Sequence, residues 1–203
     1  MCIRDRVNTN GENLLFRVVQ EFIKEQALKV GVSDTSALIA FTRDGTTAFY
    51  GDFFFWVNVV AVILQAFVAS RLLKYGGFGV ILLTMPVVAL VSYTAMAFIP
   101  ILAIVKIMKI VENSTDYSIN NTARNVLWLP VPAEMIYKGK PTIDSLFVRV
   151  GDGIAALTVL VGVQLLALST QSFFVLNVGL VINWIILAFV VIREHRRLSE
   201  LSG

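Results

Sequence analysis

The most constraining feature of this sequence is the length over which it carries no charged residue. Tyr75–Val105 and Gly153–Ile192 contain no Asp, Glu, Lys or Arg, and Phe53–Ser70 is a shorter stretch of the same kind. A helix that spans a bilayer needs about 20 mostly apolar residues. The pattern predicts five complete spans, which we place at about 50–70, 78–97, 101–120, 142–167 and 173–192.

Composition supports a membrane protein over a soluble domain. Hydrophobic residues make up 57% of the 203 residues and charged residues 15%, whereas about 25% of a soluble domain is charged. The formal net charge is only +3, and the basic residues gather at span ends, so we expect no nucleic-acid partner. The predicted fold class is all-α, a polytopic transmembrane helix bundle.

A sixth helix is predicted before the first complete span. Apolar residues recur at helical spacing in residues 12–30, and we interpret this segment as the outer end of a truncated span. Residues 31–48 contain Gly31, Asp34, Asp44 and Gly45 and are predicted to form a polar loop.

The charges at the span ends predict the orientation. The connections near Arg71, near Lys138 and at the Arg193–Arg197 tail are basic, and the alternate connections carry no charge. Basic loops face the cytoplasm, so the C-terminus is predicted to be cytoplasmic.

The first residues have the marks of a non-native segment. Met1–Asp5 back-translates to the end sequence of a widely used transposase sequencing adapter, and such scars are set apart from fold reasoning. We expect residues 1–6 to be an artefact and residues 7–203 to be the natural part, with the native chain continuing upstream of Val7.

Charged and polar residues interrupt the third predicted span. Lys106, Lys109 and Glu112 are spaced by three residues, and a polar stripe continues on roughly the same side through Asn113, Tyr117, Asn120 and Arg124. Charge inside a bilayer indicates a functional site by default. The stripe lines either a water-filled path or a contact between helices.

Two further groups of charges lie around the fourth predicted span. Lys138 and Lys140 precede Pro141, and proline favours the first turn of a helix, so the span is predicted to begin there. Its N-terminus beside two lysines suits a phosphate, although lysines at a cytoplasmic helix end also serve as topological anchors. Arg149 and Asp152 are expected to form a charge pair.

No enzyme motif is present. Gly139-Lys140 lacks the remaining residues of a phosphate-binding P-loop, and His195 lies in the basic tail. We expect no catalytic residue, no metal site and no cofactor.

Several long motifs resemble one family, the ATP/ADP antiporters of plastids and intracellular bacteria, in its bacterial branch. The matching segments are Asn8–Glu12, Gly51–Asn58, Glu112–Arg124, Leu127–Pro130, Tyr137–Lys140, Ile143-Asp144, and Phe147–Arg149 with Gly151-Asp152.

The resemblance implies the second half of a major-facilitator-type transporter, with its first helix clipped and the N-terminal half of the polypeptide missing. It implies an inner-membrane location in a bacterium and a nucleotide substrate, ATP or ADP. In the family, a carboxylate on the seventh helix and a lysine at the start of the eleventh are important, and Glu12 and Lys140 fall at those places. Pro141 departs from the small residue usual there.

Three functions stay open at this point. The first is ATP/ADP exchange or nucleotide:proton symport. The second is transport of another anionic or zwitterionic solute by the same fold. The third is a membrane module without transport, in which the polar stripe serves packing only.

Overall fold

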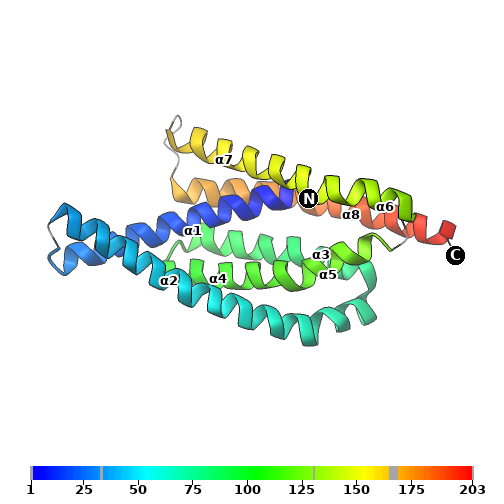
Figure 1. Cartoon of the computed structure of the whole chain (residues 1–203), viewed down its shortest axis with the longest axis horizontal. Coiled ribbons are helices and arrows are strands. Elements are labelled where there is room, and N and C mark those ends of the chain that lie inside the picture. Colours follow the sequence, from blue (N-terminus) through cyan, green and yellow to red (C-terminus); the bar gives the residue numbers. More distant parts are fainter. Residues whose placement is uncertain (1, 33, 130, 165–168, 203) are drawn as a thin grey trace.

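The computed structural model describes the chain except for residues 1, 33, 130, 165–168 and 203, and its regular elements are all helical over the described part. Joined end to end, these elements make six rods (Figure 1). In chain order they are α1 Cys2–Lys29, α2 Thr35–Ile63, η1 Leu64–Ala69, α3 Ser70–Phe98, α4 Leu102–Thr115, η2 Asp116–Asn120, α5 Asn121–Leu127, α6 Ala133–Pro141, η3 Thr142–Phe147, α7 Val148–Gln164 and α8 Thr170–Ser202. The three η elements are π-helical.

Two of the turns between rods fall close to their predicted places. Within α3, Gly77 has φ +68° and breaks the helical path, a conformation that glycine adopts without steric cost. The chain before Gly77 therefore extends the rod of α2, and the chain after it returns along the bundle. The next turn contains Pro100, between α3 and α4, as predicted.

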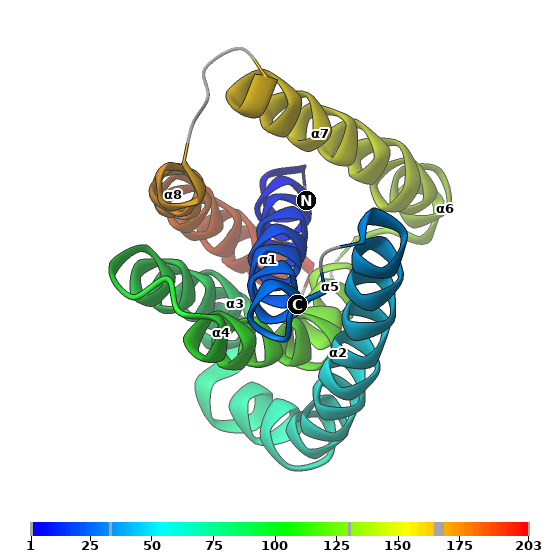
Figure 2. The same ribbon diagram turned by 90° about the vertical axis from the view of Figure 1, so that its left-hand side faces the viewer.

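Helix α1 runs through the middle of the bundle (Figure 2). It contacts α7, α8, α2 and α4, while α3 packs against α8 and α4. The main core cluster joins these elements through apolar side chains such as Leu15, Phe53, Val57, Ala89 and Phe173.

The polar loop predicted at 31–48 is wrong, because α2 begins at Thr35. Asp34 caps this helix, and its Oδ2 accepts hydrogen bonds from the Ser36 hydroxyl and from the Ala37 N–H at 3.0 Å. These bonds lower the pKa of Asp34. Gly45, which suggested a loop, lies inside α2 where a β-carbon would come within 3.0 Å of Ile23, so it permits close packing on α1.

The predicted start of the fourth span is also wrong. The helix begins at Ala133, after Pro132, and runs through α6 and η3 into α7. Pro141 is the last residue of α6 and is followed directly by the π-helical segment. Proline removes one N–H from the helical ladder, and here the chain continues as a helix across that gap. The positive end of the helix dipole therefore lies at Ala133, about two turns before Lys140.

Two helical stretches are long and apolar enough to cross a membrane: Thr35–Phe98, which turns back at Gly77, and Thr170–Arg197. Only 17% of the most apolar window of each is buried inside the bundle. Large apolar side chains such as Phe55, Phe67 and Phe189 are exposed. Exposed apolar surface on this scale fits contact with lipid. The predicted end of the fourth span, 165–167, lies outside the described residues.

Residues 2–6 continue α1 by more than one turn. Asp5 is buried and pairs with Arg4 at 2.6 Å, and Arg4 also lies 3.7 Å from Asp116.

Candidate functional site

A buried ion pair lies where α4 faces the bundle interior. Lys109 and Glu112 are both 0% exposed, and Lys109 Nζ lies 2.8 Å from Glu112 Oε2. The residues are three positions apart, which places both on one side of α4. Both ions are removed from water, so each depends on the other and on nearby polar groups for compensation.

Tyr93 of α3 completes this pair from the opposite side. Its hydroxyl lies 3.0 Å from Glu112 Oε1 and 3.0 Å from the Val7 carbonyl oxygen of α1. Lys109 Nζ also lies over the Tyr93 ring, 6.0 Å from its centre. The network therefore joins α1, α3 and α4 through one buried cluster.

Glu12 links the buried cluster to the surface of the bundle. Asn113 Nδ2 donates a hydrogen bond to Glu12 Oε1 at 2.7 Å, and Lys109 Nζ lies 3.6 Å from the same oxygen. The Glu12 side chain is 33% exposed, whereas that of Lys109 is 1% exposed. A buried cation and an amide thus orient a carboxylate that still reaches the outside of this half-bundle. We refer to Glu12, Tyr93, Lys109, Glu112 and Asn113 as the central cluster.

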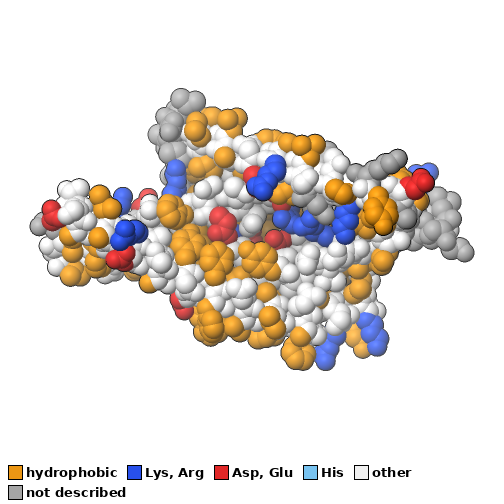
Figure 3. Space-filling view, viewed as in Figure 1, with side chains coloured by type: hydrophobic (Ala, Val, Ile, Leu, Met, Phe, Trp, Pro, Cys, Tyr) orange, Lys and Arg blue, Asp and Glu red, His pale blue; other side chains and the backbone are white. Residues whose placement is uncertain are grey.

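Figure 3 shows one face of the helix bundle, seen as in Figure 1. Charged side chains of both signs gather over its middle, around α1, and apolar side chains frame them above and below. Such a concentration of charge in the middle of an apolar helix bundle is typical of a path for a polar solute.

Gly11 lets α1 approach the central cluster. A β-carbon at this position would overlap the Tyr93 hydroxyl and come within 2.8 Å of Lys109 Nζ. Asn10, its neighbour, donates a hydrogen bond to Asn177 of α8 at 3.1 Å, which fixes α1 on the other side.

We expect Gly11→Ala to displace α1 and to lower the thermal unfolding temperature in detergent. Overpacking a tight interior costs about 1–3 kcal/mol, which exceeds the gain of roughly 0.5–1 kcal/mol from replacing a helical glycine. Gly51→Ala in α2 is the matched control, since no atom lies within 4 Å of its β-carbon position. A higher unfolding temperature for Gly11→Ala than for the wild type would contradict the close approach.

Lys106 lies one turn before the central cluster and is partly exposed. It pairs with Asp52 of α2 and lies over the Phe49 ring, 5.3 Å from its centre. The structure thus separates two residues that the sequence placed together, since Lys109 is buried in the bundle and Lys106 lies at its surface.

The π-helical segment η2 carries the rest of the predicted stripe. Asn120 is buried and donates a hydrogen bond to Asp116 at 2.6 Å, while Tyr117 is 51% exposed. Arg124 follows on α5 and lines a small pocket with Asn120. π-helical turns are frequent at functional sites, and here the π turn lies inside the Glu112–Arg124 motif.

The remaining predicted residues lie on α6 and α7. Arg149 is exposed, and among the described residues it forms no ion pair with Asp152, which instead accepts a hydrogen bond from Thr9 at 2.7 Å. Lys140 is partly buried on α6 beside Tyr137 and Pro141. No described contact joins Lys140 to the central cluster. The Lys138 side chain lies outside the described part.

Sequence reasoning missed Tyr93, Asp52 and Asn177. Asp52 could have been found from the sequence, since it is a charge at the edge of the first predicted span and a possible partner for Lys106 in the third. Tyr93 and Asn177 are uncharged, and only the packing shows that they contact charged or polar partners.

The arrangement offers binding chemistry. It surrounds one partly exposed carboxylate with a buried amide, a buried phenol and a buried cation. No three His, Cys, Asp or Glu side chains come together as a metal site within the described residues.

Comparison with known proteins gives a distant and partial similarity. No protein-family model matches the chain, and no solved structure matches it significantly. The chain is 27% identical over 125 residues to ADP,ATP carrier protein 1 of Chlamydia trachomatis, which is 52% of this chain and 24% of the carrier. The carrier of the same name from Chlamydia pneumoniae is 27% identical over 129 residues, 54% of this chain and 25% of the carrier. The match thus spans about a quarter of the length of these relatives, and the chain has distant similarity to ADP,ATP carrier proteins.

Proposed function

We propose that this chain is the C-terminal six-helix half of a secondary transporter that moves nucleotides, by ATP/ADP exchange or by nucleotide:proton symport. The observation that carries the proposal is the central cluster. A fully buried ion pair inside an apolar bundle adjoins a carboxylate, that of Glu12, whose side chain is 33% exposed. One face of the bundle bears charges of both signs (Figure 3). Similarity to ADP,ATP carrier proteins supports the nucleotide as substrate.

The proposed topology has helix α1 followed by five complete spans. Transporters of the major-facilitator type bind their substrate near the midplane between two such halves. In this arrangement the face in Figure 3 meets the other half of the protein, and the basic C-terminal tail lies in the cytoplasm of a bacterium.

The proposed substrate contacts divide into two classes by burial. Glu12, Lys106, Tyr117, Arg124 and Lys140 are exposed or partly exposed and are proposed to contact the solute. Lys109, Asn113 and Asn120 are buried, so we propose that they position their neighbours rather than touch the solute themselves.

One observation favours a second candidate, a zwitterionic solute. Glu12 has a partly exposed carboxylate, and a carboxylate binds an amine more favourably than a phosphate. Competition of nucleotide uptake by zwitterionic and purely anionic solutes separates the two candidates.

The test is exchange in proteoliposomes loaded with ADP and supplied with labelled ATP. We expect the 203-residue chain alone to give no uptake above protein-free liposomes, because alternating access needs two halves that move against each other. The same chain joined to its N-terminal half is expected to give saturable exchange that ATP and ADP inhibit more strongly than adenosine does. Saturable exchange by the chain alone would overturn the half-transporter proposal, and a joined protein that ignores nucleotides would overturn the substrate.

A further inference from the structure

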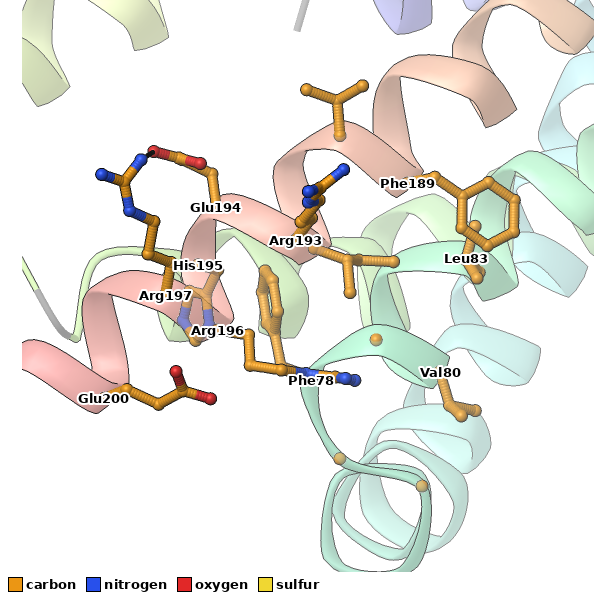
Figure 4. A pocket seen from close by; sticks show the side chains of 15 residues that line it. Phe78, Val80, Leu83, Phe189, Arg193, Glu194, His195, Arg196, Arg197 and Glu200 are labelled. Carbon is orange, nitrogen blue, oxygen red and sulfur yellow. Dashed lines mark hydrogen bonds and ion pairs between the residues drawn. The ribbon is translucent and has the colours of Figure 1, made fainter.

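An open pocket of about 1410 Å³ lies between the end of α8 and the beginning of the returning part of α3, away from the central cluster. Figure 4 shows basic side chains of α8 on one side and apolar side chains of both helices on the other. The glycines at 76, 77 and 79 line the α3 side of the pocket without filling it with side chains. His195 closes the base, with its ring stacked on Phe78 at 3.8 Å between centres and an interplanar angle of 20°.

Three arginines, at 193, 196 and 197, and two glutamates, at 194 and 200, line the pocket, so its charged side chains carry a net positive charge. Arg197 pairs with Glu194 at 3.3 Å. Arg193 and Arg196 are exposed, and of the side chains that the structure describes none forms an ion pair with either. Two guanidinium groups are thus available to one anionic group at the mouth of the pocket.

The two arginines continue an apolar stripe along α8. Ile182, Ile186 and Phe189 are 49%, 58% and 57% exposed, and their spacing places them on one side of the helix together with Arg193 and Arg196. A ligand that lies along this stripe meets apolar surface first and cations at the helix end.

We propose that this pocket binds an anionic phospholipid, with the phosphate between Arg193 and Arg196 and the acyl chains along the apolar stripe of α8. Arginine binds phosphate in a forked geometry. Basic pockets at cytoplasmic helix ends attract anionic headgroups. A soluble phosphate compound would use the arginines and leave the apolar stripe unused, so the lipid accounts for more of the surface.

The test measures binding of spin-labelled phosphatidylglycerol relative to phosphatidylcholine by the full chain reconstituted in phosphatidylcholine vesicles. The charge variant is Arg193→Gln with Arg196→Gln. Its control is Arg71→Gln with Lys74→Gln, two basic residues near the same turn that do not line the pocket. A second variant, Val80→Trp, fills the apolar wall and leaves all charges in place.

We expect the charge variant to reduce the preference for phosphatidylglycerol by at least about tenfold, since each basic residue near an anionic surface contributes roughly a fivefold factor. Val80→Trp is expected to reduce it as well, and the control variant to keep it. If the charge variant fails to insert into the vesicles, the lipid preference of Val80→Trp alone tests the proposal. An unchanged preference in both pocket variants, an equal loss in the control, or equal displacement by soluble glycerol phosphate would overturn the lipid site. None of these results depends on nucleotide transport.

Discussion

Replacing Lys109 by methionine is expected to destabilise the helix bundle by about 3–5 kcal/mol, because it leaves a buried carboxylate without its cation. Glu112 is 0% exposed, and of the ion pairs among described residues its only one is with Lys109. The Tyr93 hydroxyl at 3.0 Å from Glu112 Oε1 still offers a hydrogen bond, but it supplies no positive charge. The cost would appear as earlier unfolding when the fraction of denaturing detergent in mixed micelles is raised.

A double variant separates the ion pair from the space that it fills. Lys109→Met with Glu112→Gln removes both charges and keeps similar volumes, and replacing a buried pair by uncharged residues is often close to neutral. We therefore expect the double variant to be more stable than Lys109→Met alone, even though it carries one more substitution. The coupling between the two positions follows from the double-mutant cycle.

Lys106→Met is the matched control on the same helix. Lys106 pairs with Asp52, but the two side chains are 29% and 50% exposed, and such a pair contributes about 0–1 kcal/mol. Equal losses of stability for Lys106→Met and Lys109→Met would show that Lys109 does not form a buried ion pair with Glu112. A double variant that is less stable than either single variant would show that the charges act independently.

The contrast between these two lysines shows where sequence reasoning reached its limit. The i, i+3 spacing of Lys106, Lys109 and Glu112 predicted a shared side of α4, and the structure keeps Lys109 and Glu112 together. Which lysine is buried depends on neighbours that lie far away in the sequence. Gly11 allows α1 to approach Lys109, and Asp52 draws Lys106 toward α2.

Helix positions were predicted well where apolar stretches were long and poorly where polar residues continued a helix. The turn at Gly77 and the break at Pro100 fall between predicted spans, because glycine permits a positive φ and proline cannot donate an N–H to a helix. The segments 35–48 and 133–141 are helical despite their polar residues, since a helix needs no apolar side chains where its surface meets water. Asp34 and Pro132, the residues before these helices, are better guides to their beginnings than Asp44 or Pro141.

The corrected beginning of α6 changes what is expected of Lys140. In the proposed full-length transporter, Lys140→Gln should weaken competition by ATP and ADP by roughly ten- to a hundredfold, the loss of a charge-assisted hydrogen bond worth about 1.5–3 kcal/mol. The helix dipole adds nothing to this expectation, because its effect falls off within the first turn and the helix begins at Ala133. The measurement is inhibition of labelled ATP exchange in proteoliposomes by ATP, ADP and adenosine.

Lys74→Gln is the matched control for this substitution. Lys74 lies near a turn between rods, 5.5 Å from the centre of the Tyr75 ring, and is expected to act only as a topological anchor. Lys140→Arg should restore part of the affinity, since a guanidinium keeps the charge but binds phosphate as a wider fork. A phosphate contact predicts that competition by adenosine stays unchanged in Lys140→Gln while competition by both nucleotides weakens. Equal weakening for adenosine and ATP, or an equal effect of Lys74→Gln, would mean that Lys140 does not contact phosphate, and the nucleotide proposal would then depend on Glu12, Lys106 and Arg124.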